Sequence, residues 1–207
     1  MNAIDVAPGV SFWPGKLSSA EQKELLDAVM MRVAAAPFFR PTMPRTGKEF
    51  SVQMTNFGPL GWVSDQVGGY RYQPNHPVTG ASWPDIPNAL LVLWDETTNY
   101  GAPPQACLVN LYRSGTRMGL HRDADEPAVD APVLSVSLGD SALFRFATGE
   151  RRRDTRTLKL NSGDVLMFGG PSRLMYHGID RIQAGGSSLV KGGGRINLTL
   201  RRVSPKG

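Results

Sequence analysis

The second half of the chain consists of short apolar segments separated by turn-forming residues, and this pattern limits the folds available to it. Such segments occupy residues 106–112, 132–138, 142–147, 158–160, 165–168, 174–179 and 195–203. The breaks between them hold turn signals such as Gly139-Asp140 and Gly169-Gly170-Pro171. Short strands punctuated in this way are typical of two-sheet β architectures. The pattern therefore predicts a jelly-roll or cupin-like double sheet.

Helices are expected before this part, which makes the fold class α+β and mostly β. Ser18 and Glu21 form a capping box, so a helix should start there and end before Pro37. Its predicted apolar stripe consists of Leu25, Leu26, Val29, Met30 and Val33. A second helix is expected from about Ile86 to Asn99, and short strands at 10–13 and 48–56. With 207 residues, the chain is expected to form a single domain, 1–207.

The segment between residues 106 and 125 carries a pattern with metal chemistry. His121 and Asp123 are two apart, so in an extended chain their side chains point the same way. His177 could supply a third ligand. Two imidazoles and one carboxylate form the facial triad of non-haem Fe(II) oxygenases, which leaves coordination positions open for cosubstrate and O2. His-x-Asp by itself is a weak signal, because such tripeptides also occur by chance.

The last predicted strand has one polar and one apolar face. Its polar face holds Arg195, Asn197, Thr199 and Arg201. The simplest explanation is a half-buried strand with a solvent-facing side. Two arginines on one face also suit a dicarboxylate, because guanidinium groups bind carboxylates bidentately. Asn110 and Tyr112, on the polar face of strand 106–112, could add hydrogen bonds to such a ligand.

Residues 40 to 80 interleave aromatic and basic side chains. The aromatic residues are Phe57, Trp62, Tyr70 and Tyr72, and the basic residues are Arg45, Lys48 and Arg71. This combination suits stacking on bases and contact with phosphates, although aromatics in a loop-rich segment more often anchor it to the core. His76, between Asn75 and Pro77, is expected to be a surface residue.

The net charge indicates which binding partners suit the protein, and the cysteine content indicates its cellular compartment. The net charge of +5 suits a polyanion such as nucleic acid, or merely a solvated basic surface. The single cysteine, Cys107, excludes an internal disulfide and is expected to be a buried, inert thiol. No apolar run approaches a membrane span, and no signal-peptide pattern is present. We therefore expect a cytoplasmic monomer without membrane contact.

Taken together, these motifs resemble those of the AlkB family of Fe(II)- and 2-oxoglutarate-dependent nucleic-acid dealkylases. The matching pieces are Asn110-Leu111-Tyr112, His121-Arg122-Asp123, Tyr176-His177-Gly178, the run from Arg195 to Arg201, Met54-Thr55-Asn56, Leu60-Gly61-Trp62 and the run from Leu134 to Gly139. The resemblance implies a double-stranded β-helix core at about 106–203, with a nucleotide-recognition lid at about 40–80. It further implies Fe(II), 2-oxoglutarate and O2 as cofactor and cosubstrates.

The same resemblance assigns roles to individual residues. His121, Asp123 and His177 would hold iron, and Arg195 would pair with the far carboxylate of 2-oxoglutarate. Asn110 and Tyr112 would assist Arg195, while Asn197 and Arg201 would support the iron-chelating end. Trp62 would stack on the damaged base and Asp125 would lie near its exocyclic amino group. The other expected substrate contacts are Met54, Leu108, Ser135, Arg151, Tyr70 and Tyr72.

This resemblance implies direct-reversal repair, in which N-alkylated bases of the 1-methyladenine and 3-methylcytosine type are demethylated. Alkylated single-stranded DNA is the expected substrate, and RNA is a second candidate. Two alternatives stay open at this point. One is an oxygenase of the same class that hydroxylates a protein or small molecule, and the other is a nucleic-acid-binding module with a vestigial metal site. A kinase is set aside, because His121-Arg122-Asp123 lacks the Gly-rich loop and the Asp-Phe-Gly motif that would accompany it.

Overall fold

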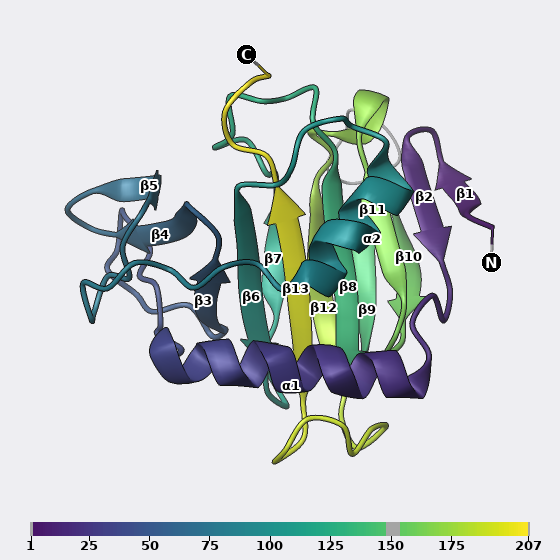
Figure 1. Ribbon diagram of the computed structural model, residues 1–207, viewed down its shortest axis with the longest axis horizontal. Helices are drawn as coiled ribbons and strands as arrows, with labels where there is room; N and C mark the ends of the chain where they lie inside the picture. The colour runs from purple at the N-terminus through teal and green to yellow at the C-terminus, as the bar shows by residue number, and fades with distance from the viewer. Residues whose placement is uncertain (1, 148–153, 207) are drawn as a thin grey trace.

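Two antiparallel sheets lie face to face in the computed structural model, which describes residues 2–147 and 154–206 (Figure 1). The larger sheet has the strand order β1 (Ile4–Ala7), β2 (Val10–Trp13), β11 (Val165–Phe168), β8 (Val133–Gly139), β13 (Arg195–Arg201), β6 (Ala106–Tyr112) and β3 (Gln53–Phe57). The smaller sheet has the order β10 (Thr155–Leu160), β9 (Ser141–Ala147), β12 (His177–Gln183) and β7 (Met118–His121). The predicted double-sheet fold is confirmed.

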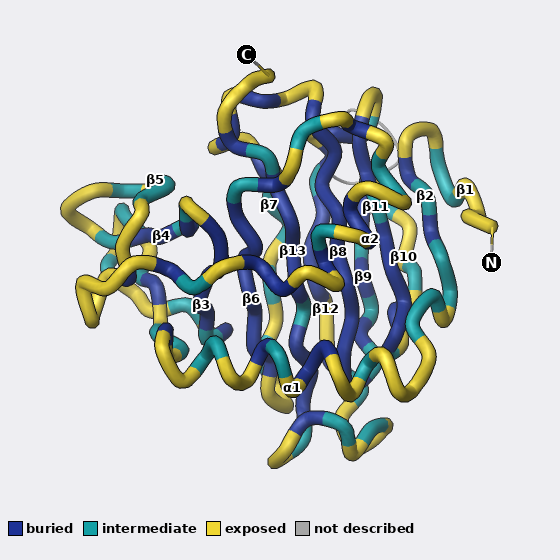
Figure 2. Tube along the Cα trace, viewed as in Figure 1, coloured by how far each residue is buried: buried dark blue, intermediate teal, exposed yellow. Residues whose placement is uncertain are grey.

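Both helices cover the outer face of the large sheet, opposite the small sheet (Figure 1). α1 (Ser19–Ala35) and α2 (Asn88–Thr98) bury their apolar side chains against β6, β8 and β13. On β13 this face consists of Ile196, Leu198 and Leu200, as the two-residue period of a strand requires. Figure 2 shows these central strands as the most deeply buried part of the molecule. The polar side of β13 must then face the other sheet.

The helix boundaries follow the sequence signals closely. Ser18 accepts a hydrogen bond from the backbone N–H of Glu21, whose side chain bonds back to Ser18, so the predicted capping box is confirmed. α1 ends at Ala35, before Pro37. The prediction for Met30 was wrong: its side chain is 45% exposed, because the buried stripe of α1 follows Leu25, Leu26 and Val29.

The space between the sheets is filled mainly by aromatic and branched side chains. Its members include Leu108, Tyr112, Phe144, Phe146, Leu166, Phe168 and Ile179. This second core borders the polar face of β13, so the space between the two sheets is lined partly by apolar and partly by polar side chains. Cys107 lies on the helix-covered side, where burial raises the pKa of its thiol, so it is the expected buried, inert cysteine.

A two-stranded hairpin, β4 (Gly61–Asp65) and β5 (Gly69–Gln73), lies beyond the β3 edge of the large sheet (Figure 1). The segment that follows contradicts the expectation for His76, which is only 2% exposed. Its Nε2 lies 2.8 Å from the carbonyl oxygen of Pro37, and Phe39 and Trp83 contact its ring. His76 is therefore a structural residue that anchors this loop region.

Two smaller features complete the description. A short 3-10 helix, η1 (Gly170–Ser172), precedes β12, and β1 lies in the lead-in where no strand was expected. Among the described residues, no helix is both long and apolar enough to cross a membrane.

Candidate active site

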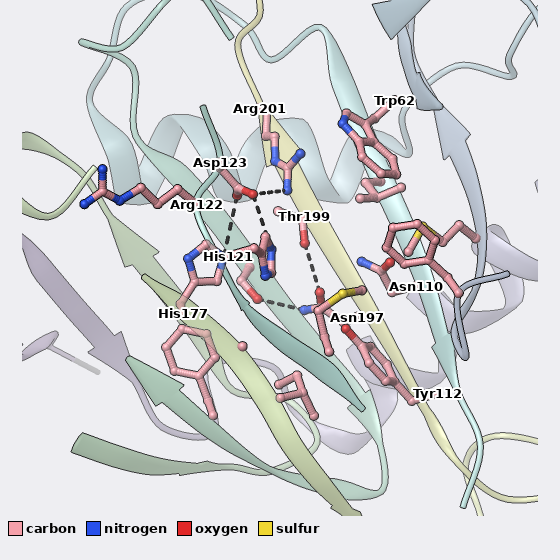
Figure 3. A pocket seen from close by; sticks show the side chains of 18 of the residues that line it. Trp62, Asn110, Tyr112, His121, Arg122, Asp123, His177, Asn197, Thr199 and Arg201 are labelled. Carbon is pink, nitrogen blue, oxygen red and sulfur yellow. Dashed lines mark hydrogen bonds and ion pairs between the residues drawn. The ribbon is translucent and has the colours of Figure 1, made fainter. Parts of the chain in front are cut away.

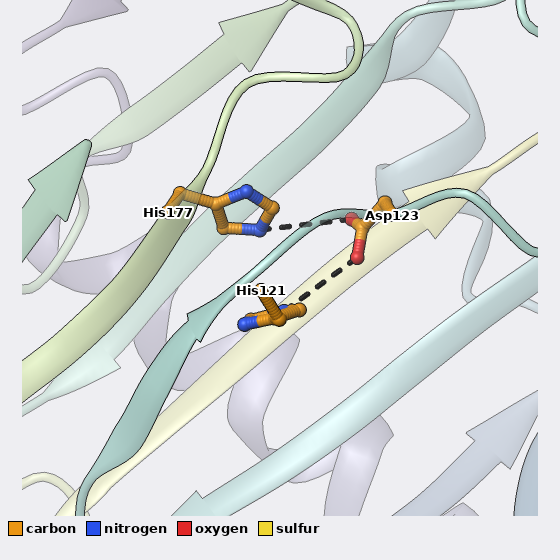
Figure 4. A group of neighbouring side chains, drawn as sticks. All are labelled: His121, Asp123 and His177. Carbon is orange, nitrogen blue, oxygen red and sulfur yellow. Dashed lines mark ion pairs between the residues drawn. The ribbon is translucent and has the colours of Figure 1, made fainter. Parts of the chain in front are cut away.

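Three side chains converge at one end of the small sheet (Figure 4). His121 ends β7, His177 begins β12, and the two residues are paired across these strands. Asp123 follows two residues after His121, where the chain leaves the strand. The ligand atoms of all three lie within 4.8 Å of one another, so the structure brings the predicted triad together.

The imidazole rings are oriented by backbone carbonyl groups. His121 Nδ1 lies 2.9 Å from the Gly119 oxygen, and His177 Nδ1 lies 3.2 Å from the Met175 oxygen. The Nε2 atoms face Asp123 instead, at 3.6 Å and 3.8 Å from its carboxylate oxygens. A hydrogen bond from one ring nitrogen commonly fixes which nitrogen remains free to bind a metal. Both rings therefore present Nε2 to the centre of the triad.

The electrostatics keep Asp123 and His177 in the protonation states that metal binding requires. Burial opposes ionisation of Asp123, but the neighbouring charges together outweigh it and the pKa falls to about 2. The strongest of these charges is Arg201, whose Nη2 lies 2.8 Å from the carboxylate. Burial lowers the pKa of His177 to about 4. At neutral pH the site thus offers a carboxylate and a neutral imidazole, as metal ligation requires.

A second group of buried polar atoms lies beside the triad on the polar face of β13 and on β6. Four of them find no hydrogen-bond partner within the described residues: Asn110 Oδ1, Arg195 Nε, Arg195 Nη1 and Arg201 Nε. The same is true of Asp123 Oδ2 in the triad itself. Leaving such groups unpaired costs free energy, so their clustering indicates a ligand that completes them. A divalent metal would satisfy the carboxylate oxygen, and a dicarboxylate would satisfy the guanidinium groups.

Arg195 has the environment expected of an anion-binding residue. Its side chain is fully buried, and Nη2 donates one hydrogen bond of 2.7 Å to Ser137 Oγ. Burial lowers the pKa of Arg195 to about 10, because desolvation of the guanidinium outweighs the opposing electrostatic effects of Tyr112 and Asp164. Asn197, its neighbour on the same face, donates 2.7 Å to Ser135 Oγ and accepts 2.9 Å from Thr199 Oγ1. The polar face of β13 is therefore enclosed rather than solvent-facing.

These groups line one cavity of about 240 Å³ between the two sheets (Figure 3). Fourteen of the sixteen predicted site residues lie on its wall: Met54, Trp62, Tyr70, Leu108, Asn110, Tyr112, His121, Asp123, Asp125, Ser135, His177, Arg195, Asn197 and Arg201. Arg151 lies outside the described residues. Tyr72 does not belong to the described lining, and its hydroxyl group instead bonds to Glu126 and, at 3.1 Å, to Arg201 Nη1.

The wall of the cavity away from the triad is aromatic. Trp62 lies across the cavity from the histidines in Figure 3, and its Nε1 donates a hydrogen bond of 2.8 Å to Asp125 Oδ2. The Tyr70 ring stacks on the Trp62 ring, with centroids 5.6 Å apart. This contact explains how the β4–β5 hairpin positions Trp62. The hydrogen bond to Asp125 places a carboxylate at the edge of the indole ring.

Several lining residues were not predicted from the sequence. They include Phe50, Met118, Arg122, Phe144, Leu160, Phe168, Ile179 and Thr199. Arg122 could have been suspected because it separates His121 from Asp123; its guanidinium lies 4.1 Å from the Tyr176 ring centroid. Thr199 shares the polar face of β13. The apolar residues carry no signal beyond their strand pattern, because a cavity wall and a core look alike in sequence.

Comparison with known proteins agrees with this geometry. The family model of the 2OG-Fe(II) oxygenase superfamily matches residues 9–201. The alpha-ketoglutarate-dependent dioxygenase AlkB homolog of Caulobacter vibrioides (strain NA1000 / CB15N) is 53% identical over 202 residues, covering 97% of this chain and 90% of that protein. For the Escherichia coli (strain K12) dioxygenase AlkB the identity is 42% over 178 residues, covering 84% and 82%.

More distant relatives extend the comparison. The solved structure of OsALKBH1 superposes with a TM-score of 0.82 at 29% identity, covering 97% of this chain and 100% of that one. The DNA N(6)-methyladenine demethylase ALKBH1C of Arabidopsis thaliana is 41% identical over 109 residues, which cover 48% of this chain and 24% of that protein. With its double-sheet fold and its 2-His-1-carboxylate triad, this chain belongs to the AlkB family of Fe(II)- and 2-oxoglutarate-dependent dioxygenases.

Proposed function

We propose that this enzyme oxidatively demethylates bases of the 1-methyladenine and 3-methylcytosine type in DNA, with RNA as a second candidate polymer. The observation that carries the proposal is the cavity with the metal triad on one wall and the Trp62–Asp125 pair on another. An aromatic face suits a flipped base, and a carboxylate suits the positive charge of such lesions. The relative named as a DNA N(6)-methyladenine demethylase supports the coarser part of the proposal, demethylation of a base in DNA.

The chain's own residues bind, orient and shield the reactants. His121, Asp123 and His177 hold the iron, and Arg195 with Asn110 and Tyr112 holds the far carboxylate of 2-oxoglutarate. Asn197 and Arg201 support its other end. Bound iron, with 2-oxoglutarate and O2, would supply the oxidation of the N-methyl group to a hydroxymethyl group. The hydroxymethyl group would leave as formaldehyde, and the 2-oxoglutarate would become succinate and CO2. Apolar side chains such as Phe144 and Phe168 keep bulk water from the cavity.

A different set of residues, apart from those that hold iron and 2-oxoglutarate, binds the nucleic acid. Residues of about 40–80 act as a nucleotide-recognition lid on the jelly-roll core of about 106–203, and Trp62 of β4 stacks on the base. Met54, Leu108 and Ser135 line the base pocket, and Tyr70 meets the phosphate backbone. A lesion on the Watson–Crick edge is already unpaired, which lowers the cost of extruding the base. The same enzyme is proposed to act as a cytoplasmic monomer.

The proposal is tested by mass spectrometry of a single-stranded oligonucleotide that carries one 1-methyladenine. The oligonucleotide is incubated with enzyme, Fe(II), 2-oxoglutarate and ascorbate in air. We expect loss of one methyl group that depends on 2-oxoglutarate. Conversion of 2-oxoglutarate to succinate without loss of the methyl group would contradict the proposed substrate. It would favour the alternative, hydroxylation of a protein or small molecule.

Asp125 is expected to favour cationic lesions through its charge. Asp125→Asn keeps an oxygen that can accept the Trp62 hydrogen bond but removes the charge. We expect demethylation of 3-methylcytosine to slow by about tenfold or more, because a charge pair at contact distance contributes about 1–4 kcal/mol in aqueous to surface-like surroundings. The uncharged lesion 3-methylthymine and the turnover of 2-oxoglutarate without nucleic acid serve as controls. Equal losses on charged and uncharged lesions would remove this role from Asp125.

A further inference from the structure

Behind the metal triad, four side chains form a closed hydrogen-bonded ring. Arg173 Nη1 donates 2.6 Å to the backbone oxygen of Asp123, and Nη2 lies 2.9 Å from Glu126 Oε2. Glu126 Oε1 lies 3.3 Å from Arg201 Nη1, and Arg201 Nη2 lies 2.8 Å from Asp123 Oδ1. The ring therefore starts at the backbone of the carboxylate ligand and returns to its side chain.

Two members of this ring, Arg173 and Glu126, are not part of the described cavity lining. Both are 2% exposed, and the third bond of Arg173, from Nε to the Ala131 oxygen, measures 2.7 Å. Burying an ion pair this deeply requires good geometry and paired hydrogen-bonding groups, otherwise desolvation exceeds the Coulomb gain. Arg173 uses all three of its guanidinium nitrogens here. Such a fully paired guanidinium has little freedom to move.

We infer that Arg173 is a positioning residue that couples the metal ligand Asp123 to the 2-oxoglutarate-binding residue Arg201. It holds the backbone of Asp123 directly and holds Arg201 through Glu126. Without Arg173, Glu126 Oε2 loses its partner, and the Glu126 carboxylate competes with Asp123 for Arg201. The carboxylate ligand would then lose its support on two sides. Binding of metal and binding of 2-oxoglutarate should weaken together.

A conservative substitution tests this inference. Arg173→Lys keeps the positive charge, but one ammonium group cannot reach the Asp123 oxygen, the Ala131 oxygen and Glu126 in the same geometry. Arg32→Lys is the matched control, because Arg32 also bonds backbone carbonyls, those of Asp85 at 2.7 Å and Ala28 at 3.0 Å, but on α1 far along the chain from the triad. The thermal midpoint of each metal-free variant is measured first.

The decisive readout is affinity, measured without nucleic acid. Metal-free protein is titrated with Co(II) and followed by its visible absorption, and the cobalt-loaded protein is then titrated with 2-oxoglutarate. For Arg173→Lys we expect both affinities to fall by about 10- to 100-fold, the range for losing a group that orients a metal ligand. Arg32→Lys should stay within about twofold of wild type, below the roughly tenfold effect of one charged hydrogen bond. Unchanged Co(II) and 2-oxoglutarate affinities in folded Arg173→Lys would overturn the inference.

A second variant keeps the test decisive if Arg173→Lys fails to fold. Glu126→Gln preserves the shape of the side chain but places an N–H donor against a guanidinium group. We expect the KM for 2-oxoglutarate to rise more than kcat falls, because Arg201 is displaced while the histidine ligands remain. If only the thermal stability falls, while the affinities for Co(II) and 2-oxoglutarate stay at their wild-type values, the ring stabilises the fold and does not position the ligands. Because no nucleic acid is present, this result does not depend on the proposed demethylase substrate.

Discussion

Replacing His121 with alanine is expected to abolish metal binding and 2-oxoglutarate turnover while leaving the fold intact. The substitution removes one of three ligands, and the remaining two cannot form the facial triad. The His121 side chain is 40% exposed, so its removal leaves little cavity and should change the free energy of unfolding by less than about 1 kcal/mol. Metal content after reconstitution and succinate formation measure the effect.

His76 provides the matched control, since the chain has three histidines and this one lies outside the triad. His76→Ala removes the ring next to the Pro37 oxygen and the acceptor of the Val78 and Thr79 backbone N–H groups. We expect a loss of about 1–3 kcal/mol in the free energy of unfolding, because a buried ring that packs against Phe39 and Trp83 is removed together with its hydrogen bonds. The metal stoichiometry of the folded protein should stay unchanged. Full metal binding by His121→Ala would contradict the assignment of the triad.

Replacing Arg195 with methionine is expected to raise the 2-oxoglutarate requirement strongly. Two of its guanidinium nitrogens are buried without a hydrogen-bond partner among the described residues, so in the proposed complex they carry the charge-assisted hydrogen bonds to the cosubstrate. Each such bond contributes about 1.5–3 kcal/mol, and the KM for 2-oxoglutarate should therefore rise by about 10- to 100-fold or more. Succinate formation as a function of 2-oxoglutarate concentration gives this value.

Without cosubstrate, the same variant is expected to lose no stability, although its binding of 2-oxoglutarate is impaired. Arg195 is fully buried, and in the part of the chain that the structure describes it forms no ion pair with a carboxylate, so methionine removes a desolvated charge while filling similar space. We expect the thermal midpoint of the protein without 2-oxoglutarate to stay level or rise. Arg202→Met, at the half-buried neighbouring arginine that bonds the Ser204 and Pro103 carbonyls, should leave the KM unchanged. An unchanged KM for Arg195→Met would remove Arg195 from the clamp.

The proposed site could be predicted largely because strand periodicity is a local property. Side chains two residues apart on a strand share a face, so the grouping of Arg195, Asn197 and Arg201 followed from the sequence alone. The same reasoning placed His121 and Asp123 together. The resemblance of these motifs to the AlkB family then connected segments that periodicity cannot connect. It supported His177 as the third ligand and brought Trp62 into the same site.

Other features depended on which layer covers each face. The polar side of β13 looked like a solvent-facing surface by pattern, but the small sheet covers it and makes it the wall of a cavity. His76 was expected at the surface because its neighbours are polar or proline, whereas Phe39 and Trp83 bury it. Tyr72 was expected at the substrate, and its hydroxyl group instead reaches Glu126 and Arg201.

The limit of prediction from the sequence is clearest for the ring of Arg173, Glu126, Arg201 and Asp123. Arg173 and Glu126 are 47 residues apart, and Arg201 and Glu126 are 75 apart. Charged residues at such separations carry no local pattern that distinguishes a buried pair from two solvated side chains. The sequence by itself determined most strands of the two sheets, which residues share a strand face, and the ligand types. Only the tertiary structure decided which charges are buried together, because burial and pairing are set by segments that meet through long-range folding.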